Sequence, residues 1–572
     1  MGMDADYNKM RLVALGEAPA DLLFINGRVV SVFTGEILEA NAAIYGSFIA
    51  GVGDYQRGQT IVDLQGAYLL PGFIDSHIHI ESSMLTPASF AEAAVPHGTT
   101  AVMADPHEIV NVLGLEGWRY MVESSRELPL DFFWQIPSCV PATHMETAGG
   151  FIGPRELDEA LAAYPECPAL AEMMNYPGVV YGAGPVLDLI QQARELGLII
   201  EGHAPGLRGR ELNAYLISGC NSDHECTSRA EALEKLRRGM RLLIREGSAA
   251  HNLEELLPLL DDHNYGRCAF CCDDRHPADL LREGHMDHVV RKAVAAGLPA
   301  VRAIAMATLN PALHYGLKSR GAVAPGYLAD LVVVDNLRDF KVEQVYKAGI
   351  LTAAQGQYLG PVNKTDRVDE IHSLVLPEIS GRFILKAPHD TNKVRVIEVI
   401  PGQILTRSLL MPIKEAMQDP AINTLAVVER HGRNGNVAVG LVKGFNLERG
   451  ALASSVGHDS HNLILVGKDP GILEHAARVV ARMGGGMAVF DGNELVASLA
   501  LPVAGLMSPQ PAAVLADQHE SLETAARSLG CRLTAPFMTL SFLALPVIPE
   551  LRLTDQGLVD VNKFALVDIW EQ

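Results

Sequence analysis

The pattern of apolar and polar residues divides the chain into regions that differ in their predicted secondary structure. From Asp21 to about Gly72, short apolar runs alternate with turns, as in DLLFINGRVVSV and TIVDLQGAYLLPG. The same pattern of short apolar runs and turns occurs again at Gly326–Ala353, in GYLADLVVVDNLRDF and the residues after it. Short runs of this kind, bounded by turn residues, are typical of strands in hairpins. We therefore expect one β-sandwich that is assembled from both flanks of a central region.

Between these flanks, strand-like apolar runs alternate with amphipathic helical segments. The helical segments include VLDLIQQAREL and RAEALEKLRRGM, in which apolar residues recur at helical spacing. Strands that alternate with helices indicate a parallel sheet, and eight such units suggest a (β/α)8 barrel. The predicted strands are Phe73–His79, Thr99–Ala104, Asp131–Pro137, Leu170–Asn175, Leu198–Ala204, Cys220–Glu225, Met240–Ala249 and Cys268–Asp273.

Beyond about Lys364 the pattern changes again. Strand runs such as VRVIEVI and VAVGLVKGF frame a few helices, which predicts a separate α+β domain. The predicted fold class is therefore α/β, with a (β/α)8 barrel, a flanking β-sandwich and a C-terminal α+β domain. The expected limits are residues 1–70 and 326–365 for the two parts of the sandwich, 71–325 for the barrel and 380–572 for the C-terminal domain.

The composition describes an ordinary globular protein with an excess of negative charge. Of 572 residues, 48% are hydrophobic and 20% are charged, and the formal net charge is -22. This charge disfavours nucleic acid and anionic membranes as partners, and no apolar run is long enough to span a bilayer. Because the chain has only eight cysteines and no recognisable secretory signal, we expect reduced thiols and a cytoplasmic location.

Imidazoles and carboxylates recur at the carboxyl ends of the predicted strands. His77 and His79 are two residues apart on one strand, so their side chains point to the same face. In a barrel the strand ends meet at one rim, and nitrogen and oxygen donors gathered there suit a divalent metal. One histidine at a strand end is more often structural, but several strands that end this way predict a metal site. The candidate ligands are His77, His79, Glu172, His203, His224 and Asp273.

A further polar segment, DPHE, follows the second predicted strand. Its Asp105, His107 and Glu108 could serve an additional metal or the substrate. The alternative is a proline-containing turn that caps a helix, and the two interpretations are equally supported. At the eighth strand, Asp273 is preferred as a ligand because it directly follows the strand run, and Asp274 could orient it or join the additional site.

Three other segments carry histidine or cysteine. His285 and His288 in GHMDH are expected in the solvated first turn of a helix. Cys268 and Cys271 are better explained as core thiols than as zinc ligands, because strand alternation buries them and no second pair is nearby. The segment 455–462, SVGHDSHN, could close over the active site or lie at a subunit interface.

These segments resemble the amidohydrolase superfamily and, within it, the bacterial-type adenine deaminase family. The matching strings include GFIDSHIHIESSML, DPHEIVNVLG, EGHAPGLRGRELNAY, DDRHPADLLREGHMDHVVR and SSVGHDSHN, and the resemblance covers nearly the whole chain. It implies a metal-dependent hydrolase barrel in which the six candidate ligands bind a binuclear centre, with Glu172 as the bridge where many relatives use a carbamylated lysine. The implied ions are Mn(II) or Fe(II), and the ligands are also compatible with Zn(II).

The same resemblance implies the activity, a metal-dependent aminohydrolase acting on a cyclic amidine. A metal-activated water would attack C6 of adenine and release hypoxanthine and ammonia, as in purine salvage or adenine catabolism. Asp273 would accept the proton of that water, and Glu225 or Glu108 would protonate the ring. The expected partner is a small purine base, and the expected assembly is a homodimer.

Two other functions stay open. One is another amidohydrolase that acts on a different purine or on a cyclic amide, although the bridging lysine typical of the latter enzymes is replaced by Glu172. The other is an inactive scaffold, which should have lost some of the ligands.

Overall fold

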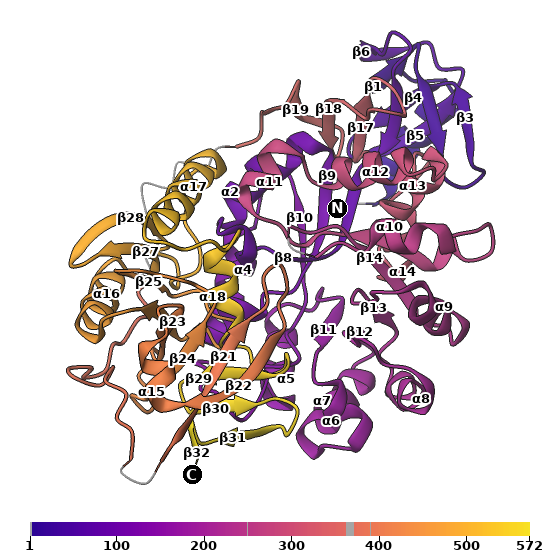
Figure 1. The fold of residues 1–572 in the computed structure, drawn as a ribbon. Helices are drawn as coiled ribbons and strands as arrows, with labels where there is room; N and C mark the ends of the chain where they lie inside the picture. Colours follow the sequence, from indigo (N-terminus) through magenta and orange to yellow (C-terminus); the bar gives the residue numbers. More distant parts are fainter. Residues whose placement is uncertain (1–2, 249, 362–370, 389–390, 572) are drawn as a thin grey trace.

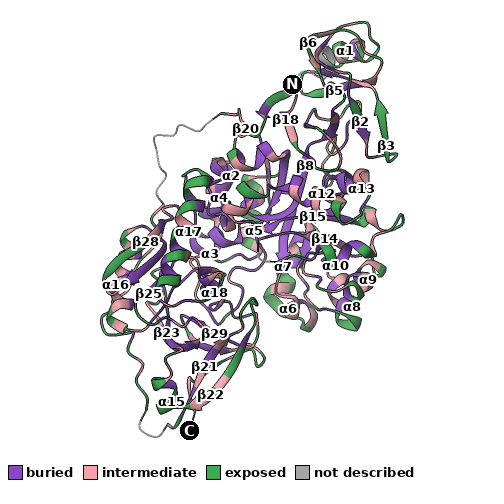
Figure 2. Cartoon of the chain, turned by 45° about the horizontal axis from the view of Figure 1, so that its top comes forward, coloured by how far each residue is buried: buried purple, intermediate pink, exposed green. Residues whose placement is uncertain are grey.

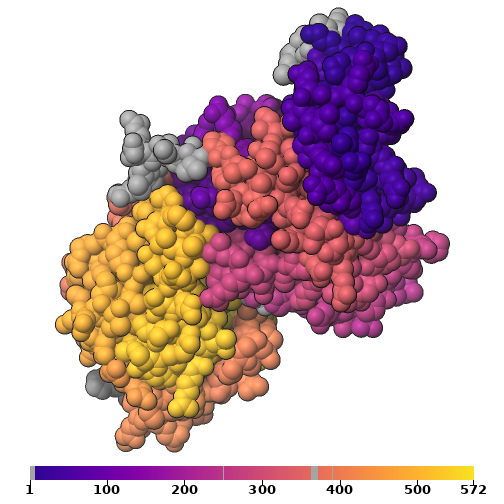
Figure 3. Space-filling view, turned by 90° about the horizontal axis from the view of Figure 1, so that it is seen from above, coloured from indigo at the N-terminus to yellow at the C-terminus, as the bar shows by residue number. Residues whose placement is uncertain are grey.

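The computed structural model describes residues 3–248, 250–361, 371–388 and 391–571. Figure 1 shows three groups of elements along the chain: strands at the N-terminal end, a central α/β part and a strand-rich C-terminal part. In the space-filling view of Figure 3, the C-terminal part forms a block against the central part. Within the described ranges, no helix has both the length and the apolar character that crossing a bilayer requires.

Two sheets lie beside the central part. One has the strand order β5-β4-β1-β6, and the other has the order β20-β19-β18-β17-β7-β2-β3, so residues from both flanks of the central part share a sheet. Phe24 of the first sheet contacts Tyr346 of the second edge to face, with ring centroids 4.9 Å apart. The bounds are β1 (Ala20–Ile25), β2 (Arg28–Ser31), β3 (Glu36–Glu39), β4 (Asn41–Tyr45), β5 (Phe48–Gly53), β6 (Gly58–Asp63), β7 (Tyr68–Pro71), β17 (Leu331–Val334), β18 (Val342–Lys347), β19 (Ile350–Ala354) and β20 (Gln357–Tyr358), with α1 (Met3–Ala14) preceding them.

The central strands are parallel and follow one another in chain order. Hydrogen-bonded pairs join β8 to β9, β9 to β10, β11 to β12, β13 to β14 and β14 to β15. Single bridges, Ile136 with Leu170 and Ile200 with Cys220, connect these groups, and β16 pairs with β8. The series therefore returns to its first strand, with all carboxyl ends on one side. The bounds are β8 (Phe73–His79), β9 (Thr99–Ala104), β10 (Asp131–Trp134), β11 (Ala169–Met173), β12 (Ile199–Gly202), β13 (Ser222–Asp223), β14 (Arg241–Arg245), β15 (Cys268–Cys271) and β16 (Asp273–Asp274).

Amphipathic helices cover the outside of these strands. In α12, Val289, Val290 and Ala293 are buried at helical spacing, as expected of a helix with one apolar face. Figure 2 shows the central strands buried, with exposed residues on the outer faces of α8 and α9. The bounds are α2 (Pro87–Ala94), α3 (His107–Leu113), α4 (Leu115–Ser124), α5 (Pro154–Ala163), α6 (Tyr176–Tyr181), α7 (Gly184–Glu195), α8 (Gly209–Ile217), α9 (Arg229–Arg237), α10 (Leu253–Leu256), α11 (Pro277–Arg282), α12 (Met286–Ala295), α13 (Ala300–Met306) and α14 (Leu309–His314).

The C-terminal part contains a mixed sheet with the order β22-β21-β24-β23-β26-β25-β27-β28, to which β32 adds beside β21. Helix α16 packs on it through Leu473, Ala476 and Val480, and α17 contacts α11 and α2 of the central part. The bounds are β21 (Lys393–Val399), β22 (Thr406–Pro412), α15 (Ile413–Gln418), β23 (Ile422–Val428), β24 (Val437–Lys443), β25 (Ala451–Ser454), β26 (Leu463–Gly467), α16 (Pro470–Arg482), β27 (Gly486–Asp491), β28 (Glu494–Ala500), α17 (Ala512–Ser528), α18 (Pro536–Phe542), β29 (Leu551–Thr554), β30 (Gly557–Asp560), β31 (Ala565–Val567) and β32 (Trp570–Glu571).

A strand lies within or beside each of the eight runs predicted for the central part. The eighth run is interrupted after Cys271, where Asp273 adopts a left-handed φ of 61°. The predicted end of the seventh run at Ala249 and the expected sandwich limit at residues 362–365 lie outside the described residues. The eight cysteines are buried and unpaired, as expected of core thiols.

Candidate metal centre

The candidate ligand histidines meet at the carboxyl ends of the central strands. His77 and His79, at the end of β8, have ring centroids 4.8 Å apart. His77 also stacks on His224, which follows β13, with centroids 4.2 Å apart. The ring of His203, which follows β12, lies 5.3 Å from that of His224. Residues from three strands thus place four imidazoles around one point.

Glu172, near the end of β11, lies at the centre of these imidazoles. Its Oε1 is 3.2 Å from Nε2 of His79 and 3.8 Å from Nε2 of His77. Its Oε2 is 2.6 Å from Nδ1 of His203 and 3.2 Å from Nε2 of His224. Each oxygen therefore faces different imidazoles, which is the placement that a carboxylate needs to bridge two cations.

Asp273 completes the cluster, whereas its neighbour Asp274 does not enter it. Oδ1 of Asp273 is 3.5 Å from Nε2 of His79, and Oδ2 is 3.7 Å from Nε2 of His224. Asp274 instead accepts a hydrogen bond from the hydroxyl of Ser82. The left-handed backbone of Asp273 is a strained conformation for a residue other than glycine, and such strain concentrates at functional sites.

Although burial opposes it, Glu172 raises the pKa of His79, His203 and His224, whereas the pKa of His77 is lowered. Burial, followed by the nearby His224 and His79, lowers the pKa of His77 well below its usual value. A neutral imidazole is the form that binds a metal. Burial alone would raise the pKa of Glu172, but His203 and the other imidazoles hold it well below its usual value. The carboxylate therefore stays ionised.

Buried polar atoms that lack a hydrogen-bond partner provide an independent test of whether the cluster fits a metal. Both ring nitrogens of His77 are buried without a hydrogen-bond partner among the described residues, and such atoms are costly unless a ligand satisfies them. Donor atoms of His77, Glu172 and His224 lie within 4.8 Å of one another, as do those of His77, His79 and Asp273. Nitrogen and carboxylate donors at this spacing fit a divalent transition metal.

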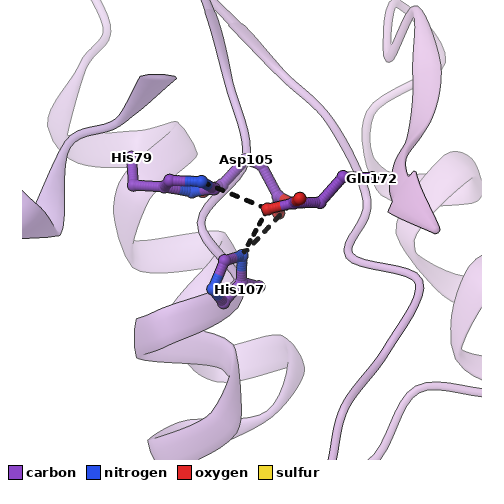
Figure 4. A group of neighbouring side chains, drawn as sticks. All are labelled: His79, Asp105, His107 and Glu172. Carbon is purple, nitrogen blue, oxygen red and sulfur yellow. Dashed lines mark hydrogen bonds and ion pairs between the residues drawn. The ribbon is translucent and has the colours of Figure 1, made fainter. Parts of the chain in front are cut away.

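The DPHE segment begins a helix, and its side chains lie beside the cluster. Pro106 precedes α3, which begins at His107, so the segment is a proline-containing start of a helix. Its side chains also reach the cluster, because Nδ1 of His107 lies 3.3 Å from Oδ2 of Asp105 and 3.7 Å from Oε1 of Glu172. Figure 4 shows these residues with His79 around the Glu172 carboxylate. Their donor atoms also lie close enough together to hold a cation.

Arg245, at the end of β14, is a residue that sequence reasoning missed. Its guanidinium donates to the carboxylates of Asp273 and Glu225, the latter at 2.5 Å. Although burial opposes it, Arg245 lowers the pKa of Asp273. The available clue was its position, a charged residue that ends the apolar run RLLIR as the ligands end other strands.

Glu108 faces away from the imidazole cluster, towards the C-terminal part. Its Oε1 accepts a hydrogen bond from Ser82 at 3.1 Å and lies 3.6 Å from Nδ1 of His458. Its Oε2 is 3.9 Å from Nε2 of His461, and burial raises the pKa of Glu108. The segment 455–462 therefore lies beside Glu108 of the DPHE segment.

The prediction of a solvated His285 is wrong. His285 is fully buried, because it precedes α12, which packs against β8 and β15. Its Nε2 lies 3.1 Å from Oδ2 of Asp75. Oδ1 of Asp75 accepts hydrogen bonds from the backbone N–H groups of His77 and Cys272. Asp75 therefore connects β8, which carries two candidate ligands, to the residue that follows β15. His288 remains partly exposed.

Two family models match the chain, "Amidohydrolase family" over residues 68–352 and "Adenine deaminase C-terminal domain" over residues 403–565. An adenine deaminase of Dehalococcoides mccartyi is 48% identical over 99% of both chains. Another, from Desulfatibacillum aliphaticivorans, is 46% identical over 98% of both chains. Among solved structures, an N-acetyl-D-glucosamine-6-phosphate deacetylase from Mycobacterium smegmatis overlaps 58% of this chain and 100% of that chain, with a TM-score of 0.46 and 19% identity.

Proposed function

The chain belongs to the adenine deaminase family of the amidohydrolases, and on this basis we propose that it hydrolyses adenine to hypoxanthine and ammonia. Within the site, the observation that supports the proposal is the position of the Glu172 carboxylate. It lies between the imidazoles of His77 and His79 on one side and those of His203 and His224 on the other. The relatives match over both the central and the C-terminal parts, so the activity is assigned to the chain as a whole.

The proposed metal ligands are the residues of the cluster, with Glu172 as the bridge between two ions and Mn(II) or Fe(II) as the ions. When bound, such ions would lower the pKa of a water molecule to about 7. The ligands are His77, His79, Glu172, His203, His224 and Asp273.

Asp273 is proposed as the group that moves the proton of the attacking water. Its carboxylate accepts this proton and delivers it to the amino group that leaves from C6. Arg245 keeps that carboxylate oriented through its hydrogen bond. Asp273 also lies 3.5 Å from His79 and 3.7 Å from His224, so it is close to the proposed metal ligands.

Attack at C6 requires a proton at N1 of the ring, for which Glu108 and Glu225 are the candidates. Burial raises the pKa of Glu108, so this carboxyl group keeps a proton more readily than an exposed one. Glu225 accepts a hydrogen bond from Arg245 at 2.5 Å, so its carboxylate is already engaged by the guanidinium. These surroundings favour Glu108 as the acid.

The proposed fold is the (β/α)8 barrel with a flanking β-sandwich and a C-terminal α+β domain, with the limits predicted from the sequence. The parallel pairings that return to β8 support the barrel, and the sheet shared by both flanks supports the sandwich. The homodimer and the cytoplasmic location stay predictions. Sedimentation velocity tests whether the protein is a dimer.

The test is an assay of the protein expressed with manganese after removal of adventitious zinc. Adenine loss is followed by ultraviolet absorbance and ammonia release by a coupled assay, with a His77→Ala/His79→Ala variant beside the wild type. We expect metal-dependent formation of hypoxanthine that the variant lacks. If the metal-loaded wild type leaves adenine unchanged, the substrate assignment fails, and other purines and cyclic amides are tested next.

A further inference from the structure

A narrow cavity lies between the central part and the C-terminal part. One wall is polar and contains Ser82, Glu108 and Asp274, which follow β8, β9 and Asp273. The opposite wall belongs to the C-terminal part and includes His458 and Phe542. The cavity is therefore built by two regions of the chain that are far apart in sequence.

The polar wall is continuous with the candidate metal centre. Asp274 is the neighbour of Asp273, and Ser82 donates hydrogen bonds to both Asp274 and Glu108. Glu108 in turn follows His107, which lies 3.7 Å from the Glu172 carboxylate. A molecule in the cavity would therefore touch the residues that border the cluster.

The opposite wall is aromatic and is held firmly by its own domain. The imidazole of His458 stacks on the ring of Phe542, with centroids 4.7 Å apart and planes inclined by 26°. The backbone N–H of His458 donates to the hydroxyl of Ser541 at 3.3 Å. The buried guanidinium of Arg430 donates to the backbone carbonyls of His461 and Ala504, which fixes the segment that carries His458.

A flat heteroaromatic base matches this combination of walls, because it has polar edges and apolar faces. We propose that His458 and Phe542 form the wall that selects the purine base, with the edge of the base directed at Ser82, Glu108 and Asp274. This inference rests on the proposed function and assigns to the C-terminal part a role in substrate specificity. Neither residue is proposed as a metal ligand.

A cation is the competing occupant of this region, since donor atoms of Glu108, His458 and His461 lie within 4.8 Å of one another. Three observations favour the base. Oε1 of Glu108 already accepts the Ser82 hydroxyl, the face of His458 lies against Phe542, and the same cavity is lined by the apolar side chains of Met487 and Phe537.

The cavity holds about 50 Å³, whereas occupied ligand pockets typically span ~300–1,000 Å³. A base therefore enters only when side chains of the wall move. Met487 and Met538 line the cavity, and methionine is the apolar side chain that adapts most readily.

The test uses the full-length, metal-loaded enzyme and the variants His458→Asn and Phe542→Leu. We expect KM for adenine to rise at least tenfold in each, with kcat changed less than threefold and metal content unchanged. The ratio of kcat/KM values for adenine and a 6-chloropurine should also shift. His475→Asn is the matched control, since His475 contacts Phe490 in the same domain at a centroid distance of 5.8 Å but does not line the cavity, and it should match the wild type.

Three results would overturn the proposal: an unchanged KM in both variants, a fall in kcat alone, or the loss of one metal equivalent from His458→Asn, which would reveal a cation site. Failure of the proposed function is distinguishable, because it appears as absent turnover in the wild type. In that case equilibrium dialysis with labelled adenine still compares binding by the wild type, His458→Asn and His475→Asn. Equal binding in all three also overturns the proposal.

Discussion

The two oxygens of Glu172 face different imidazoles, and this division makes it the most sensitive residue of the cluster. Oε1 lies nearest His79 at 3.2 Å, and Oε2 lies nearest His203 at 2.6 Å. A glutamine at this position would keep one oxygen but present an NH2 group, which cannot coordinate a cation, on the other side. The Glu172→Gln change would therefore remove the group that is proposed to bridge the two ions.

The Glu172→Gln variant is expected to lose metal affinity by more than ~100-fold, because even partners that only support ligands contribute ~10–100-fold. Metal content per chain after dialysis measures this loss. The exposed Glu254→Gln variant is the control and should keep the wild-type content. Retention of two ions by Glu172→Gln would rule out the bridge.

The choice of ring acid is testable by two parallel substitutions. Glu108→Gln is expected to lower kcat by ~10²–10⁴, the usual contribution of a general acid, while metal content is kept. Glu225→Gln is expected to lower kcat by less, because its carboxylate is bound to Arg245. Steady-state kinetics of both variants decide between them, and the opposite order would assign the acid to Glu225.

The candidate ligands were predictable from the sequence, but their supporting partners were not. His77 and His79 stand out because a strand places alternate residues on one face. The contact between Asp75 and His285 depends on how α12 packs against β8, and no local pattern encodes that packing. The position of Arg245 at the end of RLLIR was a clue in the sequence, but its role arises from its distance to Asp273.

Among the elements, the ends of β12 and β13 are held by a buried ion-pair network. Lys235 of α9 is fully buried and donates to Asp223 at 2.9 Å, to Glu231 at 2.7 Å and to the carbonyl of Ala204 at 2.6 Å. The backbone N–H of Ala204 donates to Asp223 at 2.8 Å. Because Ala204 and Asp223 each adjoin a candidate ligand histidine, the helix fixes two imidazoles through this network.

Replacement of Lys235 by methionine leaves two buried carboxylates without their cation. Loss of one partner of a buried pair costs ~3–5 kcal/mol, so we expect Lys235→Met to lower the free energy of unfolding by about that amount. Urea denaturation of the metal-loaded protein measures it. The exposed Lys414→Met variant should differ little from the wild type, and an equally small effect of Lys235→Met would contradict the network.

The helices were easier to predict than the strand ends. VLDLIQQAREL and RAEALEKLRRGM correspond to α7 and α9, because a 3.6-residue apolar period is a strong local pattern. The run CAFCCD reads as one strand, yet it divides between β15 and the start of β16. Apolar alternation carries no information about the left-handed backbone of Asp273, which depends on the surrounding cluster.

Across the whole molecule, α11 of the central part meets α17 of the C-terminal part. His276, which precedes α11, and His519 of α17 have ring centroids 5.8 Å apart at this junction. Burial, followed by the proximity of His519, lowers the pKa of His276 to about 4. The imidazole of His276 at this junction is therefore harder to protonate than an exposed histidine.

This depressed pKa predicts how stability depends on pH. In the unfolded chain His276 titrates near ~6.5, so between about pH 4 and pH 6.5 the unfolded state binds more protons than the folded state, and the free energy of unfolding rises with pH. We expect a His276→Asn variant to show a smaller rise across this window. Urea denaturation at several pH values measures both slopes, and identical slopes would contradict the role of His276.

The placement of the C-terminal part relative to the metal cluster was beyond the sequence. Its strand-rich pattern predicted a separate region, and segment 455–462 allowed two interpretations, a cover over the active site or a subunit interface. The packing of α17 against α11 and α2 and the 3.6 Å contact between His458 and Glu108 are visible only in the structure. Contacts between regions so far apart in the chain leave no periodic pattern that could be read in advance.

The small volume of the cavity between these two parts has a consequence for turnover. In the proposed binding mode, adenine arrives and hypoxanthine leaves only while side chains of the wall such as Met487 and Met538 are displaced, so each cycle includes an opening and a closing. Motions of this kind often limit kcat in place of the chemical step, and they are slowed by friction with the solvent. We therefore expect kcat to fall as the viscosity of the medium is raised with sucrose, and a slow substrate, for which chemistry is limiting, to be insensitive to the same change.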